Sequence, residues 1–393
     1  MTPTIRIGVA GLGAAGIAFI PALRKNLGFD WVACADPADE VRHKFSELYG
    51  VRAYASLTEM LKHPGLDAVL VATPTDLHAA QVLEAAAAGK HVLVEKPMAV
   101  CLEDARTMAQ AAESAGIILL VGHSHSHDLP VRRMHELIAS GELGRVRMVN
   151  TWCYSDWMHR PRRASEFDVA QGGGVTFRQG SHQFDVLRLL CGGRARSVRA
   201  RTFDWHPERR SIGAHSVWID FEDGAAATAI YNGYGGLASS ELTGHISEWG
   251  FEEVPGSHGR RAQTARSPEE ELRAKKERAL TAIPAQAPFQ PTFGLTLVSC
   301  ERGDIRQSPQ GLLVYTEGER REIILPTDRS PRDLVLEELH DAIRGKVPAT
   351  HDGRWGLANL EICLAAIASS VNGAEVLLHE QVAPHVSDHK VQP

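Results

Sequence analysis

Three glycines near the start of the chain have the spacing of a turn that binds a dinucleotide. Residues 6–16 read RIGVAGLGAAG, in which Gly11, Gly13 and Gly16 form the pattern G-x-G-x-x-G. Glycines at these positions allow a tight turn, a close approach of the backbone to a pyrophosphate, and close packing of a helix on a strand. The Ala-rich run that follows predicts a helix whose first N–H groups face the phosphates. We therefore expect a dinucleotide site formed by Gly11, Leu12, Gly13, Ala14, Ala15 and Gly16.

Asp36 ends a second apolar segment, roughly 20 residues beyond the last of these glycines, which is the usual place for an acidic residue in dinucleotide-binding folds. Its carboxylate can accept hydrogen bonds from the adenosine ribose of NAD. A carboxylate also repels the 2′-phosphate of NADP. No arginine follows it immediately, although Arg42 lies a turn or so away. The pattern predicts NAD as the cofactor.

Lys96 is the first candidate for catalysis. It follows the apolar run 91–94 and lies between Glu95 and Pro97, and the proline restricts the local backbone. A single lysine in a loop is usually an exposed charge. A lysine at the mouth of a nicotinamide pocket can instead polarise a substrate oxygen and, when desolvated, exchange a proton.

The order of the elements predicts how these residues meet. Short apolar runs alternate with helical segments as far as residue 122, which predicts a doubly wound parallel α/β sheet of the Rossmann type in a domain of residues 1–124. In such sheets ligands bind beyond the carboxyl ends of the strands. Those ends carry Gly11, Asp36, Thr73, Lys96 and His123, so we expect these five residues along one edge.

Residues 125–393 predict a second domain of the α+β type. Segments at 146–154, 198–203, 216–221 and 225–232, with further strands at 293–300 and 312–315, indicate an open, mainly antiparallel sheet. Helices are expected at 331–344 and 354–372. The charged stretch 256–287 interrupts the pattern and predicts an insertion with a short helix, acting as a flexible segment, a lid or a subunit arm.

The composition restricts the class of protein. A chain of 393 residues with 44% hydrophobic and 23% charged residues is typical of a soluble globular protein with two domains. A net charge of −6 argues against nucleic acid or an anionic membrane as partner, and no apolar run reaches the ~20 residues that span a bilayer. The first strand begins almost at once, and the six cysteines are scattered. We therefore expect no signal peptide and a cytoplasmic protein.

Together these motifs resemble the Gfo/Idh/MocA oxidoreductases, a family that includes glucose–fructose oxidoreductase and inositol dehydrogenase. The resemblance rests on GLGAAG, Asp36, the run ATPTDLHAAQ at 72–81 and the triplet EKP at 95–97, and it covers nearly the whole chain. It implies NAD(P)-linked hydride transfer with Lys96 as the active-site lysine. It also places His78 near the cofactor, although a polar residue that starts a helix is an equal alternative. The implied cofactor segments further include Ala72, Thr73, Pro74, Glu95 and His123.

Members of this family usually carry a D-x-G-x-H-x-x-D motif that opens a helix. This chain keeps Gly180, His182 and Asp185 but has Arg178 in place of the first aspartate. The match makes His182 a candidate for proton transfer beside Lys96. A guanidinium is always positive and offers a fork of donors that suits a carboxylate. Arg178 therefore predicts an anionic group on the substrate, and an ordinary structural ion pair is the alternative.

The segment GHSHSHD at 122–128 has histidines at alternate positions, which would share one face of a strand. Such spacing could bind a metal, but hydride transfer needs none, so we expect no metal and a pocket lined by histidines, with His123 closest to the nicotinamide. A loop with Trp157, Arg160 and two further arginines at 162 and 163 follows. That mixture could contact a flat, anionic ligand, with Trp157 and Arg160 binding the substrate, although basic loops are more often simply solvated.

Within the family, GHSHSHD, Arg178 and the stretch 293–315 look most like the bacterial cis-dihydrodiol dehydrogenases of phthalate degradation. This resemblance implies that cis-4,5-dihydroxy-4,5-dihydrophthalate is oxidised to 4,5-dihydroxyphthalate with NAD⁺. One alternative is a sugar or polyol dehydrogenase, against which the missing aspartate counts. Another is a non-catalytic NAD(P)-binding regulator, which would be expected to lack Lys96 or His182. The family also implies a homo-oligomer, a dimer or tetramer, formed through the exposed sheet of the second domain.

Overall fold

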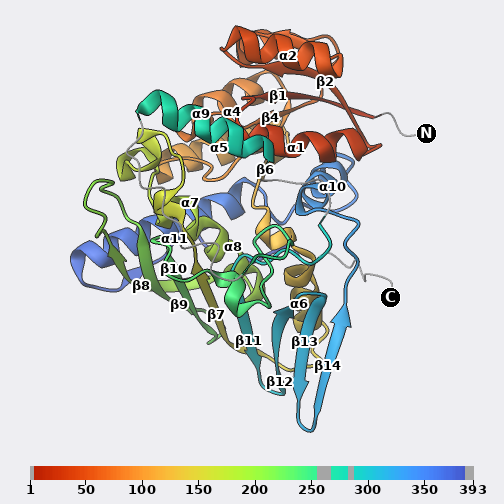
Figure 1. Ribbon diagram of the computed structural model, residues 1–393. Coiled ribbons are helices and arrows are strands. Elements are labelled where there is room, and N and C mark those ends of the chain that lie inside the picture. Colours follow the sequence, from red (N-terminus) through yellow and green to blue (C-terminus); the bar gives the residue numbers. More distant parts are fainter. Residues whose placement is uncertain (1–3, 255–266, 282–286, 386–393) are drawn as a thin grey trace.

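The computed structural model describes residues 4–254, 267–281 and 287–385, which build two sheets of different kinds (Figure 1). The first is parallel throughout, with strand order β3-β2-β1-β4-β5-β6. Its strands are β1 (Ile5–Ala10), β2 (Phe29–Ala35), β3 (Arg52–Tyr54), β4 (Ala68–Val71), β5 (His91–Val94) and β6 (Leu119–Val121). The helices between them are α1 (Ala14–Lys25), α2 (Asp39–Tyr49), α3 (Leu57–Met60), α4 (Thr75–Ala87) and α5 (Leu102–Ala115). This confirms the predicted Rossmann sheet.

The central strands are mostly apolar, with Arg6 of β1 and His91 of β5 as exceptions, because helices cover both faces of the sheet. All four residues of β4 are buried, and so are the last three of β5. Helix ends follow local rules: α2 and α5 stop where Gly50 and Gly116 take left-handed backbone angles, which end a helix at little cost for a glycine.

The second sheet has nine strands in the order β14-β13-β12-β11-β7-β10-β9-β8-β15. Only β7 and β10 pair in parallel; every other pair is antiparallel, as predicted. The strands are β7 (Val146–Tyr154), β8 (Ala195–Phe203), β9 (Ala214–Phe221), β10 (Ala226–Asn232), β11 (Leu295–Cys300), β12 (Gly303–Ser308), β13 (Gly311–Thr316), β14 (Glu319–Ile324) and β15 (Val376–Leu377). Strands β12 and β14 were not predicted, because their sequences GDIRQS and ERREII are rich in charge.

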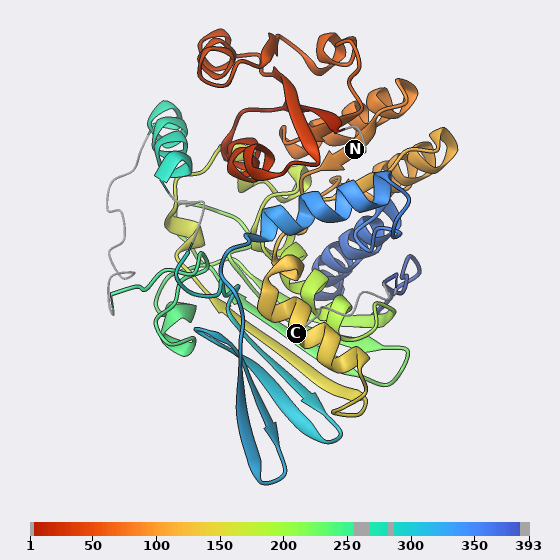
Figure 2. The same ribbon diagram turned by 90° about the vertical axis from the view of Figure 1, so that its right-hand side faces the viewer.

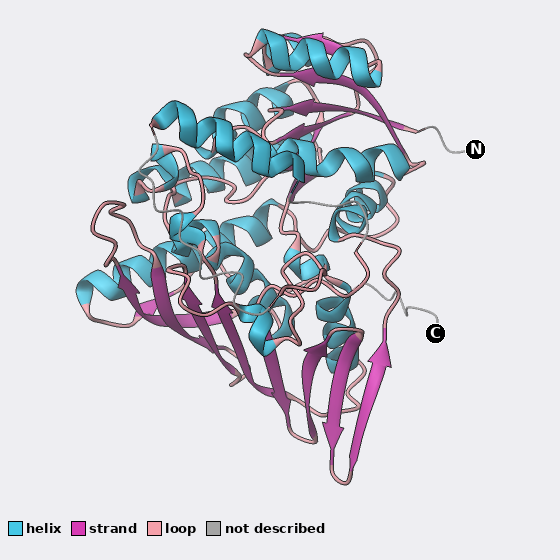
Figure 3. Ribbon diagram, in the orientation of Figure 1, coloured by secondary structure: helices cyan, strands magenta, loops and turns pink. Residues whose placement is uncertain are grey.

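Among the described residues, helices cover one face of this sheet (Figure 3). They are α6 (Leu129–Ala139), α7 (Val175–Arg178), α8 (Gly180–Leu190) and α11 (Gly353–Asn372), with contacts of α8 to β7, α11 to β8 and α6 to β13. On the opposite face Met148, Trp152 and Trp218 are exposed.

The C-terminal helices join the two halves. Helix α10 (Pro331–Ile343) packs on α1, and α11 packs on both α5 and β8, so these helices lie between the two sheets (Figure 2). Val335, Leu336 and Leu339 of α10 belong to the same buried cluster as Val9 of β1 and Phe19 of α1. The Rossmann core is thus completed by residues from the other end of the chain.

Part of the charged insertion is described as helix α9 (Pro268–Thr281), which confirms the predicted short helix and packs on α1. Residues 256–266 and 282–286 of the insertion, and the last eight residues of the chain, lie outside the described ranges. Within those ranges, no helix combines the length and apolar character needed to cross a membrane.

Candidate functional site

A cleft of about 740 Å³ lies at the carboxyl edge of the parallel sheet and is lined by both halves of the chain. The Rossmann side contributes Gly11, Gly13, Ala14, Ala15, Asp36, Ala72, Thr73, Pro74, Glu95 and Lys96. The other side contributes Trp157, Arg160, Arg162, Arg163, Arg178, His182 and Glu248, together with Ser124, His125 and Arg332. The cleft therefore brings together most of the residues that the sequence singled out.

The glycine turn fits a pyrophosphate. Gly11 has φ +90°, and a Cβ on it would lie 2.6 Å from the carbonyl oxygen of Ala72, so only glycine is tolerated there. A Cβ on Gly16 would lie 2.1 Å from the carbonyl oxygen of Gly11, which explains the close packing of α1. A Cβ on Gly13 would meet nothing within 4 Å, so this glycine leaves open space at the start of α1. That is the geometry needed for phosphate to approach the backbone.

The Asp36 carboxylate is held in place at the end of β2. It accepts hydrogen bonds from the backbone N–H of Leu12 at 2.9 Å and of Ala38 at 2.9 Å. Each carboxylate oxygen retains acceptor capacity for a ribose hydroxyl. Arg42 donates to the carbonyl oxygen of Pro37 at 3.1 Å and pairs with Asp39. Its guanidinium is thus engaged beside Asp36, and the surroundings fit the ribose of NAD.

His78 is buried at the base of the cleft but does not line it. Its ring nitrogens lie 3.0 Å from the carbonyl oxygens of Pro97 and of Thr73. Burial lowers the pKa of His78 to about 4. The histidine therefore links the segments that follow β4 and β5, and it positions the backbone that carries Lys96.

Lys96 points into the cleft from the end of β5, and its peptide bond to Pro97 is cis. Its ammonium donates to the carbonyl oxygen of Arg178 at 2.6 Å, which ties the two halves of the site together. Burial lowers the pKa of Lys96 to about 8, with the Glu95 carboxylate opposing the shift. Glu95 in turn accepts a hydrogen bond from the Lys96 backbone N–H at 3.2 Å.

His182 lies in the first turn of α8 and is 5% exposed. Its Nδ1 is buried without a hydrogen-bond partner. Burial, reinforced by the charges of Lys96 and His125, holds the pKa of His182 well below its usual value, so the imidazole is neutral. A neutral imidazole beside a cationic lysine can accept a proton from a substrate hydroxyl.

Arg178 ends α7 and lines the cleft. Its Nε is buried without a hydrogen-bond partner, and the guanidinium forms no ion pair with any residue in the described ranges. Burial lowers the pKa of Arg178, with Glu166 opposing. An arginine in this state can form a bidentate pair with a carboxylate that enters the cleft.

Two other arginines of the loop, Arg160 and Arg162, are already paired. Arg160 donates to Asp156 at 2.6 Å and lies 3.9 Å from Glu248. Arg162 pairs with Glu166 at 3.1 Å and stacks 4.1 Å from the ring centre of Trp157, which is fully buried at the cleft wall.

His123 lies behind the cleft wall and does not line it. It is 2% exposed, and both ring nitrogens are buried without hydrogen-bond partners. Burial lowers the pKa of His123 to about 4, with Asp185 opposing. Its expected contact with the nicotinamide stays a prediction.

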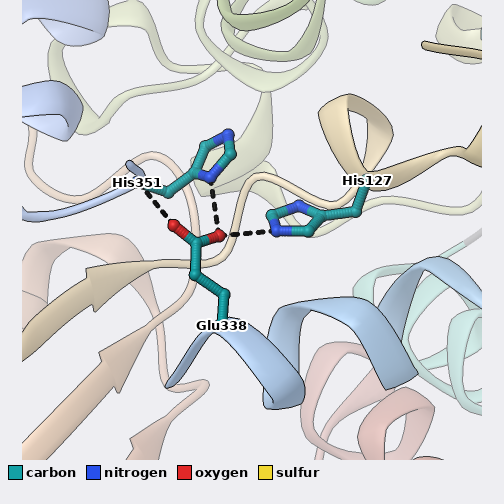
Figure 4. Close-up of side chains that lie close together, drawn as sticks. All are labelled: His127, Glu338 and His351. Atoms are coloured by element: carbon teal, nitrogen blue, oxygen red, sulfur yellow. Dashed lines mark hydrogen bonds and ion pairs between the residues drawn. The ribbon is translucent and has the colours of Figure 1, made fainter. Parts of the chain in front are cut away.

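The alternating histidines do not lie on a strand, which corrects that expectation. They follow β6 in a loop and a single 3-10 turn (His125–His127), and the turn sends His125 and His127 in different directions. His127 and His351 flank Glu338 on α10 (Figure 4). The Glu338 carboxylate accepts from His127 Nε2 at 2.7 Å and from His351 Nδ1 at 2.8 Å.

These three residues have donor types that could hold a metal ion. Their facing atoms, however, already hydrogen-bond to one another. His127 Nδ1 also lies 2.9 Å from the carbonyl oxygen of His123, and His351 Nε2 lies 2.8 Å from Ser126. Burial raises the pKa of Glu338, but the two histidines outweigh it and hold that pKa well below its usual value. We interpret the trio as a hydrogen-bonded, charged link between α10, the turn before α11 and the loop after β6.

Sequence reasoning expected histidines of segment 122–128 to line the pocket, and His125 does so, whereas it did not single out Glu248 or Arg332. His125 Nδ1 lies 3.0 Å from Asp128, and its Nε2 lies 3.5 Å from Glu248. Burial lowers the pKa of His125, but Asp128 and Glu248 outweigh it and raise the pKa to about 9. The alternating histidines were a signal for His125, whereas Glu248 lies in a loop with no periodic pattern.

Comparisons with known proteins agree with this geometry. Residues 5–123 match the family model described as "oxidoreductase family, NAD-binding Rossmann fold", and residues 131–237 match the GFO/IDH/MocA C-terminal domain. The chain is 38% identical over 376 residues to 1-carboxy-3-chloro-3,4-dihydroxycyclohexa-1,5-diene dehydrogenase of Comamonas testosteroni, covering 92% of this chain and 94% of that protein.

Two further relatives are similar to this chain to different degrees. The structure of a dehydrogenase from Bordetella bronchiseptica superposes with a TM-score of 0.90 at 37% identity, covering 95% of this chain and 100% of that one. A scyllo-inositol 2-dehydrogenase (NAD(+)) of Bacillus subtilis is 27% identical over 234 residues, covering 58% of this chain and 66% of that protein.

Proposed function

This chain belongs to the Gfo/Idh/MocA family of NAD-binding oxidoreductases, and we propose that it oxidises a carboxylated cyclohexadiene cis-diol. The specific substrate that we propose is cis-4,5-dihydroxy-4,5-dihydrophthalate, which gives 4,5-dihydroxyphthalate. The observation that carries the proposal is Arg178, a partly buried cation whose Nε lacks a partner, beside Lys96 and His182. The name of the Comamonas relative, which specifies a carboxyl group and a diol on a cyclohexadiene ring, supports the same substrate class.

The residues divide the reaction among them. NAD⁺, held by the glycine turn at Gly11 and Gly13 and by Asp36, would supply the hydride acceptor for the carbinol carbon. The Lys96 ammonium faces the hydroxyl oxygen and stabilises the negative charge that develops there. His182, neutral and close by, accepts the hydroxyl proton. Arg178 binds a ring carboxylate and fixes the ring against the reacting groups.

A second carboxylate would meet a different part of the cleft. Arg160 and Arg162 are paired with Asp156 and Glu166, so neither is a simple anion site. Arg163 is exposed where the same loop lines the cleft. We assign the second carboxylate of the phthalate diol to Arg163.

A sugar or polyol is the second candidate substrate, and the similarity to the scyllo-inositol dehydrogenase favours it. Such substrates carry no anion for Arg178. The third hypothesis, a non-catalytic regulator, gives no role to the arrangement of Lys96 with His182.

Initial rates of NADH formation separate these functions. The substrates to compare are the cis-dihydrodiol of phthalate, the dihydrodiol without carboxylates, myo-inositol and glucose, each with NAD⁺ and with NADP⁺. Turnover confined to carboxylated dihydrodiols supports the proposal. Turnover of inositol or glucose instead would assign the chain to the polyol enzymes, and no turnover by the intact protein would favour the regulator.

We also propose that copies of this chain associate in the cytoplasm through the bare face of the nine-stranded sheet. Trp152 and Trp218 lie on this face, on strands β7 and β9, and Trp218 is 44% exposed. Exposed apolar surface of this kind commonly marks an interface. Sedimentation of the purified protein tests it, since a monomer at micromolar concentration would contradict it.

A further inference from the structure

Glu248 occupies a position in the cleft that the proposed oxidation does not use. It follows the short 3-10 helix η5 (Ser239–Leu242) and lines the cleft that holds Lys96 and His182. Its carboxylate lies between two cations, with Oε1 3.5 Å from His125 Nε2 and Oε2 3.9 Å from Arg160 Nη1. The side chain is 25% exposed. The group is thus oriented from both sides and still faces the cleft.

His125 connects this carboxylate to the catalytic histidine. Its ring stacks on Phe293 with centroids 4.2 Å apart and meets His182 edge-on at 4.6 Å. Asp128 holds its other nitrogen at 3.0 Å. Asp128, His125 and Glu248 therefore form a second group of acids and bases, and the ring of His125 joins it to His182.

The proposed oxidation itself leaves a reaction unfinished. Removing a hydride and the hydroxyl proton from one carbinol of a cyclohexadiene diol gives a hydroxy ketone, not an aromatic ring. The neighbouring carbon still bears a hydrogen and a hydroxyl group. The ring becomes a catechol only when that carbon-bound proton leaves and the ketone oxygen is protonated.

We propose that Glu248, positioned by His125, is the base that removes this carbon-bound proton and completes the aromatisation. The carbon–hydrogen bond breaks, and its electron pair forms the new ring double bond. The carbonyl π pair moves to the oxygen, which takes a proton from the ammonium of Lys96 or from the newly protonated His182. Protons and electrons balance without another oxidant. This inference rests on the proposed dihydrodiol oxidation.

The other carboxylates of the described cleft are less well placed for this proton transfer. Asp36 lies at the ribose end, and Glu95 accepts from the Lys96 backbone. Glu166 is bound by Arg162 and Lys275. Glu84 belongs to the outer part of α4, away from the end that carries His78. Of these acids, only Glu248 contacts a ring that in turn contacts His182.

The test is a single-turnover experiment with Glu248→Gln, which keeps the shape of the side chain and removes its basicity. NADH is followed by its absorbance, and catechol by rapid quenching and chromatography, with the cis-dihydrodiol of phthalate as substrate. General acid–base catalysis contributes about 10²–10⁴-fold. We therefore expect NADH to form at near wild-type rate in the variant, with catechol lagging by about 100-fold or until the spontaneous reaction overtakes it.

Glu252→Gln is the matched control, because Glu252 is an exposed glutamate in the same loop. It should show no lag. His125→Phe keeps the stacking on Phe293 and should show a smaller lag than Glu248→Gln. Simultaneous NADH and catechol in Glu248→Gln would overturn the inference and leave the proposed oxidation intact, as would an equal loss of both. No oxidation of any dihydrodiol by the wild type would instead remove the proposed function itself.

Discussion

Replacing Arg178 with Met should separate substrate binding from folding stability. The guanidinium has no protein carboxylate to leave behind, since it forms no ion pair within the described chain. A hydrogen bond to a charged group is worth about 1.5–3 kcal/mol, and about 1.4 kcal/mol corresponds to a factor of ten. We therefore expect KM for a carboxylated dihydrodiol to rise by about 10–150-fold.

The same substitution should not harm the fold. The Nε of Arg178 is buried without a partner, and leaving such a group unsatisfied costs about 1–3 kcal/mol. Because the side chain is only partly buried, we expect Arg178→Met to recover the lower end of that range as free energy of folding. The melting temperature of Arg178→Met should therefore equal or exceed that of the wild type.

The assay is the initial rate of NADH formation with the carboxylated dihydrodiol and with the dihydrodiol that lacks carboxylates. The initial rate with the uncarboxylated diol should change little in Arg178→Met, since this substrate has no carboxylate for Arg178 to bind. Arg210→Ala is the matched control, because Arg210 is an exposed arginine paired with Asp204 on the surface. An equal loss for both diols, or a drop in melting temperature of several degrees, would refute the reasoning and favour a structural role.

Three further outcomes follow from the geometry. Lys96 has a pKa of about 8 and is protonated below it, so kcat/KM should fall as the pH rises through that value. The variant Lys96→Arg stays charged and should move the decline above pH ~10. An unchanged pH profile in this variant would contradict the cationic role of Lys96. Gly13→Ala adds a Cβ into open space at φ −80°, where the pyrophosphate would approach the backbone. NADH fluorescence titration should therefore show weaker affinity with no change in melting temperature, whereas retained affinity would move the pyrophosphate elsewhere. Glu338→Gln removes the anion between His127 and His351 and should lower the free energy of unfolding by about 3–5 kcal/mol in denaturant titrations. Treatment with EDTA should leave the melting temperature of the wild type unchanged. A loss of stability in EDTA would show that the trio holds a metal.

The Rossmann domain, residues 1–124, could be predicted well because its signals are local. Most strands of the parallel sheet are short apolar runs, β3 being the exception, and the spacing of the glycines predicts the turn at Gly11. Asp36 and Lys96 then follow from one rule, that parallel strands present their carboxyl ends at the same edge. The cleft brings these residues together as that rule requires.

The rest of the site depends on contacts between distant segments. Glu248 reaches the cleft from a loop whose sequence carries no periodic signal, and Arg332 reaches it from the first turn of a helix that was predicted but whose packing partner the sequence does not reveal. The histidine segment misled the prediction because alternation in sequence gives a shared face only on a strand, and here the chain turns after Val121. The unpaired state of Arg178, compared with the paired Arg160, is likewise a property of the folded chain alone.

The position of α10 has a consequence for how the protein is made. The first 121 residues contain every strand of the parallel sheet, but Val335, Leu336 and Leu339 cover its core only after some 200 further residues have been joined. At ribosomal rates of about 5–20 residues per second, the nascent domain keeps an apolar surface open for about 10–40 s. A growing chain in that state is a natural client for chaperones. A fragment ended after β6 would retain the open surface permanently, and we expect it to aggregate where the full chain does not.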